Sequence, residues 1–308
     1  MFSEAKASSN YKRLQRFFRG FALKYVEVAG FVLKHVPMGD EGWVVTIDRT
    51  IWHLGKTPIN ILVLGIVWGS VTIPVVWCVL PKKGNSNTGE RIDLLDRFLA
   101  VVEPEKIAWI LADREFIGED WFGALIDRKI DYSIRIRENF VTTNSRGDLV
   151  PVCQLFRGLK PNQVRVLRKP RVICGQALYI SGTISARGEY LIVVSHRYAY
   201  EAIEQYAQRW TIETLFGCMK TRGFNLEQTH ITDPERMERL FALVVIAATW
   251  AYAVGEWIEQ QTPVKLKKHG RRPVGIFRQG LNFLINIILN CDVKSDPFSA
   301  ALRVLSCT

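Results

Sequence analysis

Several common sequence signals are missing from this chain of 308 residues. Its six cysteines stand far apart, with no CxxC pair and no histidine at the spacing of a zinc ligand. Scattered cysteines are typical of free core thiols, so we expect no disulfide framework, no zinc site and a reducing cytoplasmic location. The basic N-terminal residues lack an uninterrupted apolar segment and a small-residue cleavage site, which argues against a signal peptide. No internal repeat and no low-complexity linker is present.

Acidic residues are also too few to balance the charge. Forty-one lysines and arginines stand against 30 acidic residues, which leaves a formal net charge of +11. Such an excess favours a polyanionic partner, either nucleic acid or an anionic membrane surface. The 48% hydrophobic content is sufficient for a packed core in one large domain or two modest ones.

One long uncharged run resembles a membrane span. Residues 59–80 carry no charge over 22 positions, which is long enough to cross a bilayer. The run is rich in Val and Ile, however, and "WGS" at 68–70 and Pro74 divide it. We therefore predict two buried strands joined by a Gly-Ser turn. The apolar run 240–255 is too short to span and is predicted to be a core helix, so we expect no membrane partner.

The order of the predicted elements indicates an α/β fold. "WVVTID" (43–48) is predicted to be a strand that ends at Asp48, and the hairpin follows it. A helix at 90–102, the strand 107–112 followed by Asp113, a further helix and the strand 131–137 complete a β-β-β-α-β-α-β order. That order matches a ribonuclease H-like mixed-sheet core.

The remaining segments complete the predicted organisation. Short β-type runs separated by Gly and Pro indicate a β-strand-rich insertion, and the chain is then predicted to be helical from about 199 through 240–258. The predicted parts are a helical basic N-terminal segment (1–40), the first part of the core (41–137), the insertion (138–196), the second part of the core (197–260) and a basic, helical C-terminal segment (261–308).

Three carboxylates suggest metal-dependent chemistry. Asp48 and Asp113 follow apolar strands, and strand ends are where ligand-binding groups gather in open α/β sheets. Glu213 lies on the helix predicted after the insertion. If the fold brings the three together, they can stay ionised only around a cation, and oxygen ligands select Mg²⁺ or Mn²⁺. Two such ions can support in-line attack on a phosphodiester, which is the chemistry of a polynucleotidyl transferase.

The segment "YAQRWTIETLFGCMK" (206–220) adds polar residues to this apolar helix. The helical repeat places four of them within an arc of roughly 60°: Tyr206, Arg209, Glu213 and Lys220. Arg209 can grip a phosphate with two N–H groups, Lys220 supplies a point charge, and Tyr206 can hydrogen-bond a phosphate or stack on a base. The alternative is an i, i+4 salt bridge between Arg209 and Glu213 worth about 0.3–0.5 kcal/mol. We assign Trp52, Trp210 and Trp257 to the core.

The spacing Tyr-x2-Arg-x3-Glu-x6-Lys in this segment resembles the YREK signature of the insertion-sequence-four family of DDE transposases. "TIDRTIW" around Asp48 and "LADREFIG" around Asp113 resemble the two aspartate motifs of that family. The resemblance covers about 43–285. It implies a DDE triad of Asp48, Asp113 and Glu213 as ligands of two Mg²⁺ or Mn²⁺ ions, and DNA contacts by Tyr206, Arg209 and Lys220.

The resemblance also implies a reaction and partners. The expected reaction is hydrolytic nicking at the ends of a mobile element, followed by attack of the freed 3′-hydroxyl on target DNA. Double-stranded DNA and a homodimer in a synaptic complex are the expected partners. Members of the family usually carry a larger end-recognition domain, whereas 47 residues precede Asp48 here.

Three alternatives stay open at this stage. The short N-terminus fits a catalytically silent, truncated transposase-derived DNA-binding protein. A ribonuclease H-like nuclease would share the acidic triad without needing the YREK residues. The uncharged run 59–80 leaves a membrane protein as the last alternative. The basic stretch 265–280 is either a further DNA contact or a solvated loop.

Overall fold

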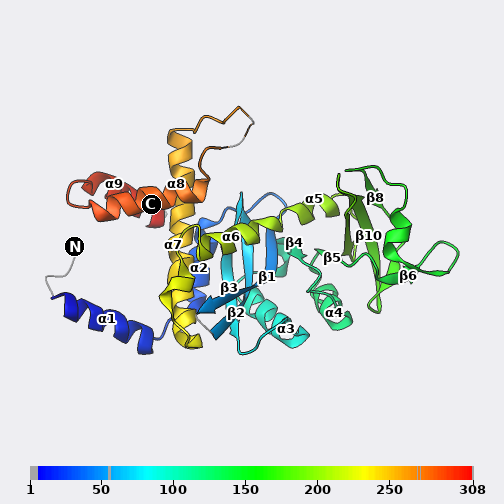
Figure 1. The fold of residues 1–308 in the computed structure, drawn as a ribbon, viewed down its shortest axis with the longest axis horizontal. Coiled ribbons are helices and arrows are strands. Elements are labelled where there is room, and N and C mark those ends of the chain that lie inside the picture. Colours follow the sequence, from blue (N-terminus) through cyan, green and yellow to red (C-terminus); the bar gives the residue numbers. More distant parts are fainter. Residues whose placement is uncertain (1–5, 55–56, 269, 271, 307–308) are drawn as a thin grey trace. The chain divides into compact units, whose positions relative to one another are not determined.

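A nine-stranded sheet dominates the computed structural model of the protein, which describes residues 6–54, 57–268, 270 and 272–306 (Figure 1). The strands are β1 (Trp43–Leu54), β2 (Thr57–Trp68), β3 (Val71–Leu80), β4 (Ile107–Ala112), β5 (Tyr132–Ile136), β6 (Val141–Thr143), β7 (Leu149–Pro151), β8 (Val164–Val166), β9 (Arg171–Ile173), β10 (Gln176–Ile184) and β11 (Tyr190–Ser195). The helices are α1 (Ala7–Gly20), α2 (Tyr25–His35), α3 (Thr88–Leu99), α4 (Glu119–Asp127), α5 (Ala202–Ala207), α6 (Trp210–Lys220), α7 (Pro234–Gln261), α8 (Ile276–Leu289) and α9 (Ser295–Ser306).

The chain divides into two compact units. The sheet unit comprises Met38–Thr50 and Ile61–Phe216, and the helical unit comprises Met1–Pro37, Ile51–Asn60 and Gly217–Thr308. The domain boundaries predicted from the sequence follow composition and the order of elements, whereas these units follow contacts in space. The predicted boundaries therefore stay a prediction.

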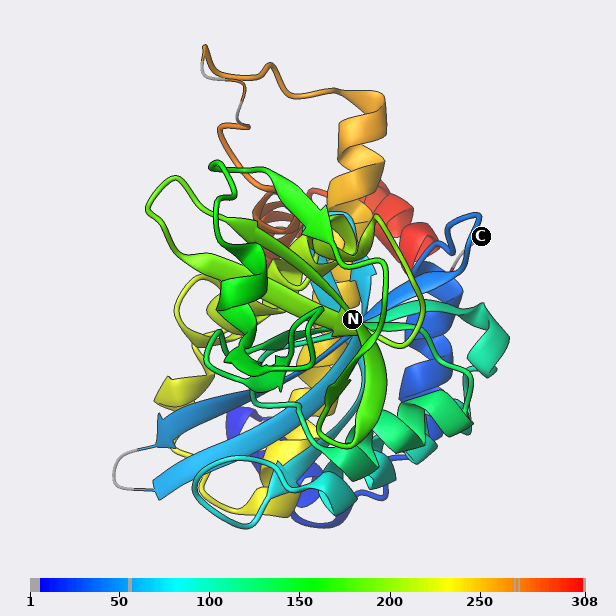
Figure 2. The same cartoon turned by 90° about the vertical axis from the view of Figure 1, so that its right-hand side faces the viewer.

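The strand order confirms the predicted fold class. The main path of the sheet is β3-β2-β1-β4-β5-β11-β10-β8, and β9 pairs with β10. β1, β4 and β5 are parallel, whereas β11 runs antiparallel to β5. The order β3-β2-β1-β4-β5, with its first three strands in sequence joined as a meander, is the ribonuclease H-like arrangement. Figures 1 and 2 show the sheet continuing from β5 into the green strands β11, β10 and β8.

Local sequence signals explain several of these elements. The uncharged run 59–80 forms the buried strands β2 and β3, which are joined at Gly69 and Ser70 as predicted. Gly69 has a φ of +57°, a conformation that glycine adopts without a steric penalty. α3 begins with a capping box, because the Asn87 side chain accepts from the Glu90 N–H and the Glu90 side chain accepts from the Asn87 N–H.

Helices cover the sheet within the sheet unit. In the view of Figure 1, α3 and α4 lie along the lower side of the sheet, and α5 lies along its upper side. α5 packs on β4, β5 and β11, where Ala202 and Tyr206 join a cluster with Trp109, Leu111 and Val193. This cluster fixes the face of the sheet on which the helical segment after β11 must lie.

Two predicted elements differ from the structure. β1 does not end at Asp48 but runs to Leu54, because the apolar and β-branched residues after Asp48 continue to pair along the long strand β2. The region after 199 is not one continuous helix, since α5 ends at Ala207 and α6 begins at Trp210. The amide groups between them bond three residues back, as Arg209 does to Tyr206 and Ile212 does to Arg209, which tightens the turn.

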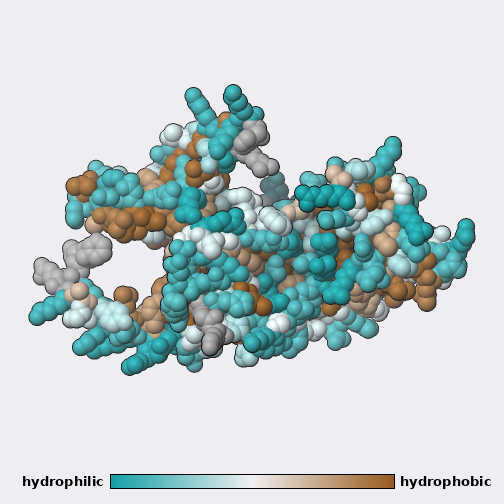
Figure 3. Space-filling view, viewed as in Figure 1, coloured by the Kyte–Doolittle hydropathy of each residue, from teal (hydrophilic) through white to brown (hydrophobic). Residues whose placement is uncertain are grey.

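The helical unit is built around α7. This helix begins at Pro234 with an Asp233 cap, and it packs against α8, α2, α9 and α1. Trp52 is fully buried and stacks on Phe241 of α7, with ring centroids 5.8 Å apart. Figure 3 shows apolar surface over α9. Leu302 of this helix is 40% exposed.

α7 is longer than the predicted core helix. Its 28 residues pass a membrane-span test of length and composition, so the expectation that this segment is too short to span was wrong. Of its most apolar stretch, 61% is buried inside the protein, as is usual for a core helix. The five described cysteines form no disulfide, and of these Cys218 is buried in the core as predicted, whereas Cys78, Cys153, Cys174 and Cys291 are only half-buried. Cys307 lies outside the described residues.

The close approach of α8 to α7 gives a stability prediction. A Cβ on Gly280 would lie 1.8 Å from the carbonyl oxygen of Ala251, so Gly280→Ala must push the two helices apart. We expect a loss of about 1–3 kcal/mol in the free energy of unfolding, measured by urea denaturation. Gly30→Ala on α2 is the control, since its Cβ would meet nothing within 4 Å. Equal stabilities of the two variants would refute the close packing.

Candidate active site

The two predicted aspartates lie side by side on neighbouring strands. Ile47 of β1 pairs with Ala112 of β4 in parallel register, so the next residues, Asp48 and Asp113, stand opposite each other. Neighbouring strands are about 4.8 Å apart. Side chains alternate along a strand, which places Asp113 on the face of Leu111, the face that α5 covers. Asp48 lies on the same face, because residues that stand opposite each other on neighbouring strands point to the same side of a sheet.

Arg209 connects this pair of strands to the predicted third carboxylate. Its Nη1 donates to Asp48 Oδ2 at 3.0 Å, and its Nη2 donates to Glu213 Oε1. Arg209 is 9% exposed, so its ion pair with Asp48 is buried, whereas the Glu213 side chain is 36% exposed. The structure therefore brings Asp48 and Glu213 to one guanidinium group, although 161 residues separate Asp48 from Arg209. The i, i+4 pair between Arg209 and Glu213 forms, but it is part of a larger contact.

Asp113 lies near this group without joining the ion pair. Its Oδ1 accepts the backbone N–H of Arg114 at 2.6 Å, and its charge acts on both Asp48 and Tyr206. Among the residues that the structure describes, no three His, Cys, Asp or Glu side chains are close enough to hold one metal ion. Two of the three predicted ligands share a partner, and the third is adjacent to them in the sheet.

The remaining predicted residues occupy different environments. Tyr206 is on α5 rather than on the helix of Glu213, and it is 6% exposed, with the guanidinium carbon of Arg209 5.8 Å from its ring centroid. Lys220 ends α6, and its Nζ donates to the carbonyl oxygen of Ile51 at 2.9 Å within the helical unit. Trp210 is 64% exposed, so its assignment to the core was wrong. It begins α6 just after the tight turn, which directs it outward.

A chain of threonines that the sequence did not suggest holds α6 to the sheet. The hydroxyl of Thr72 on β3 lies 3.0 Å from that of Thr46 on β1 and 2.7 Å from that of Thr211 on α6. Thr46 and Thr72 are fully buried. Because Thr46 is two residues before Asp48 and Thr211 two before Glu213, these bonds fix the backbone beside both carboxylates.

Burial makes the charge of Asp48 unfavourable. The pKa of Asp48 is raised to about 6, chiefly by burial and also by the nearby charges of Asp113 and Glu115, while the Arg49 N–H and Arg209 act in the opposite direction. Burial also raises the pKa of Tyr206 to about 12, so its phenol is neutral at ordinary pH. The single positive charge of Arg209 does not balance the negative charge of the carboxylates around it. A cation bound among these carboxylates would therefore be stabilised by them.

This pKa predicts a pH-dependent stability. Well below the ordinary Asp pKa of about 3.9, Asp48 is protonated in both the folded and unfolded states. As the pH rises, Asp48 ionises first in the unfolded state, so the free energy of unfolding falls. The fall ends once Asp48 also ionises in the folded state, near pH 6, and the loss of stability is constant above that pH. In EDTA, the free energy of unfolding of Asp48→Asn minus that of the wild type should increase by on the order of 1–3 kcal/mol between about pH 4 and 7.

The control for this pH dependence is Asp120→Asn, which removes an exposed carboxylate of α4. Its stability relative to the wild type should stay flat over the same range. If the stability difference between Asp48→Asn and the wild type is also independent of pH, then Asp48 titrates near its ordinary pKa.

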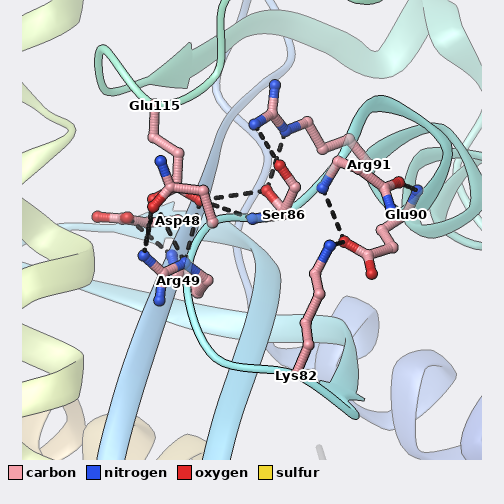
Figure 4. A network of polar contacts seen from close by, with 9 residues as sticks. Asp48, Arg49, Lys82, Ser86, Glu90, Arg91 and Glu115 are labelled. Atoms are coloured by element: carbon pink, nitrogen blue, oxygen red, sulfur yellow. Dashed lines mark hydrogen bonds and ion pairs between the residues drawn. The ribbon is translucent and has the colours of Figure 1, made fainter.

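A second polar network braces the opposite side of the two aspartate motifs (Figure 4). Arg49 donates to Glu115 at 3.0 Å, and Glu115 accepts from the backbone N–H of Ser86 at 3.1 Å. Arg91 in turn donates to the Ser86 hydroxyl at 2.9 Å. Burial opposes ionisation of Glu115, but the hydrogen bonds from Arg49 and Ser86 outweigh it and lower its pKa. The network ties the residue after Asp48 to the loop after Asp113.

The fold and this site define a ribonuclease H-like protein with acidic residues at adjacent strands. Residues 40–250 match the family of transposase DDE domains. This match covers more than half of the chain, and the chain therefore belongs to that family. A comparison with curated proteins gives no significant match.

Solved structures with some similarity include transposase and nuclease chains. A piggyBac transposase in a synaptic complex with hairpin DNA has a TM-score of 0.43 and 11% identity, with 96% of this chain and 64% of that chain covered. This chain thus spans less than two thirds of the piggyBac chain. Endonuclease V from Bacillus subtilis has a TM-score of 0.32, 9% identity and coverage of 69% and 98%. The catalytic domain of human endonuclease V has a TM-score of 0.35 and 12% identity, with 67% of this chain and 97% of that chain covered.

Proposed function

We propose that this member of the transposase DDE family nicks DNA at the ends of an insertion sequence and transfers the freed strand, with Asp48, Asp113 and Glu213 as its triad. One observation carries the proposal. The register of β1 and β4 sets Asp48 opposite Asp113, and Arg209 joins Asp48 to Glu213. The YREK spacing supports assignment to the insertion-sequence-four branch of the family.

The chemistry of the donor set suits Mg²⁺ or Mn²⁺, and two such ions are part of the proposal. Carboxylate oxygens are the preferred ligands of these ions, and the raised pKa of Asp48 reflects a buried charge that a cation would stabilise. Asp48, Asp113 and Glu213 would hold them. When bound, such ions activate the attacking oxygen and stabilise the leaving oxygen. The threonine chain and the Arg49–Glu115 pair keep the backbones of the three ligands in place.

The proposed DNA contacts come from Tyr206, Arg209 and Lys220. Arg209 offers a planar group that suits phosphate, and Lys220 retains two N–H donors beyond its bond to Ile51. We propose double-stranded DNA, both element ends and target, as the substrate, and a homodimer as the assembly that holds two ends. The β-rich segment 138–196 would be the insertion between the second aspartate and the glutamate, in a protein of the cytoplasm and nucleoid.

An assay on supercoiled DNA that carries the element ends tests the proposal. With Mg²⁺ the chain should produce nicked circles and then products joined through a 3′-end, and EDTA should stop both. Nicking without joined products would favour a nuclease. DNA binding without nicking would favour a silent, transposase-derived binding protein. Either result would overturn the proposed reaction.

A further inference from the structure

A hollow of about 600 Å³ lies at the end of the sheet next to Asp113. Its size is within the range of about 300–1,000 Å³ typical of ligand pockets. Arg114, Arg135 and Arg137 line it, together with Tyr190 and the carboxylates of Glu138 and Glu189. Its walls are formed by the end of β5, the loop after β4 and the turn that leads into β11. The surface over α5, β4 and β5 is mostly hydrophilic in Figure 3.

Strand register places Arg135 in the same row as the two aspartates. Ile47 pairs with Ala112, and Ala112 pairs with Ile134, so the next row across β1, β4 and β5 is formed by the residues that follow these three. That row reads Asp48, Asp113, Arg135. Arg135 also pairs with Val193 of β11, whose side chain belongs to the cluster beneath α5. Arg135 therefore faces the side of the sheet on which the carboxylates lie.

The position of Arg135 is unusual for an arginine. It lies on a strand that is paired on both sides, and it is partly buried between the buried residues Ile134 and Ile136. Arginines are mostly exposed in folded proteins, and fully buried ones are almost always paired. Within the described part of the chain, the guanidinium groups of Arg114, Arg135 and Arg137 form no ion pair and no side-chain hydrogen bond. Three guanidinium groups thus line one hollow without a direct ion pair, although the carboxylates of Glu138 and Glu189 also line it.

We infer that this hollow, which Arg135 lines, is a phosphate-binding site for the DNA strand that passes the acidic residues. A DNA strand carries phosphates at regular intervals, so a strand held beside Asp48 and Asp113 presents its next phosphates to the adjacent position of the row. Guanidinium groups bind phosphate with two N–H groups at once. Arg135 is then a positioning residue for the substrate, in addition to Arg209 and Lys220. This inference rests on the proposed function.

The test is DNA binding without metal, which separates binding from chemistry. We would measure the fluorescence anisotropy of a labelled duplex in EDTA across a range of NaCl concentrations. Arg135→Gln should weaken binding about 10-fold at low salt. It should also lower the slope of log affinity against log salt by about 1, as expected for the loss of one phosphate contact. Arg135→Lys retains the charge and should lose less, which keeps the test valid if the glutamine variant folds poorly.

Arg146→Gln is the matched control. Arg146 is exposed in the turn between β6 and β7 of the same unit, so this variant removes one positive charge away from the hollow. Equal losses in Arg135→Gln and Arg146→Gln would overturn the inference, since they would show only a general effect of charge. An unchanged affinity of Arg135→Gln for the duplex would also overturn it.

The proposed function can fail separately. If Glu213→Gln nicks DNA like the wild type while Arg135→Gln selectively loses duplex affinity, the triad assignment fails and the phosphate site stands. If the wild type nicks and joins DNA while Arg135→Gln matches Arg146→Gln, the phosphate site fails alone. A wild-type chain that does not bind duplex DNA at low salt would refute both.

Discussion

Asp113→Asn is expected to lower the rate of DNA nicking by about three orders of magnitude or more, as is typical when one member of a catalytic group is removed. Asparagine keeps the size of the side chain but removes the charge that would hold a cation opposite Asp48. Asp48→Asn and Glu213→Gln should show losses of the same order. A gel assay on supercoiled DNA with Mg²⁺ measures the rates.

The triad residues should also act as a unit. A double variant, Asp48→Asn with Asp113→Asn, should be little worse than either single variant, because each removal already disables the site. Asp120→Asn, which removes an exposed carboxylate of α4, should nick at the wild-type rate. Wild-type nicking by Asp113→Asn would eliminate Asp113 from the triad. Losses that multiply in the double variant would argue that the aspartates act independently.

The second large effect concerns Arg209. Its guanidinium is the buried partner of Asp48 and also binds Glu213, so Arg209→Met leaves Asp48 buried without a counter-charge. In EDTA we expect a loss of about 3–5 kcal/mol in the free energy of unfolding. Mg²⁺ or Mn²⁺ should restore part of it, because a cation at the same carboxylates replaces the missing charge. Thermal unfolding with and without Mg²⁺ measures both effects.

Arg128→Met is the matched control for Arg209→Met. Arg128 bonds Asp96 at 2.8 Å, but the two side chains are 29% and 52% exposed, so this pair should contribute less than about 1 kcal/mol. Its thermal unfolding should not respond to Mg²⁺ more than that of the wild type. If Arg209→Met loses no more than Arg128→Met, or gains nothing from Mg²⁺, then Arg209 does not neutralise a cation-binding cluster.

Local patterns in the sequence were sufficient for much of the fold. The strand 107–112 is β4 as predicted, and the run 59–80 is the predicted pair of strands. Both follow from signals within a few residues, namely apolar runs, glycine and proline. The continuation of β1 past Asp48 depends instead on its pairing with β2, which a pattern within 43–48 cannot contain.

The sequence singled out three acidic residues as candidates but not the contacts that connect them. The motifs identified Asp48, Asp113 and Glu213, yet the bond from Arg209 to Asp48 and the threonine chain from Thr72 depend on the register of distant segments. The tight turn at Arg209 also separated Tyr206 from the helix of Glu213, whereas an ideal helical repeat would have kept them together.

One signal for Arg135 was present in the sequence. In "DYSIRIR" an arginine alternates with isoleucines in a predicted inner strand, and a charge at that position needs a partner. Only the register of β4 and β5 shows that Arg135 stands in the row of the aspartates. Pattern and register together, rather than either alone, indicate the role proposed for it.

The most direct measurement is an anomalous-scattering map of crystals of the protein with DNA and Mn²⁺. We predict manganese peaks bounded by the carboxylates of Asp48, Asp113 and Glu213, with a phosphate of the DNA beside them. Manganese bound elsewhere, or DNA bound with these three side chains apart and metal-free, would contradict the proposal that they form one catalytic site.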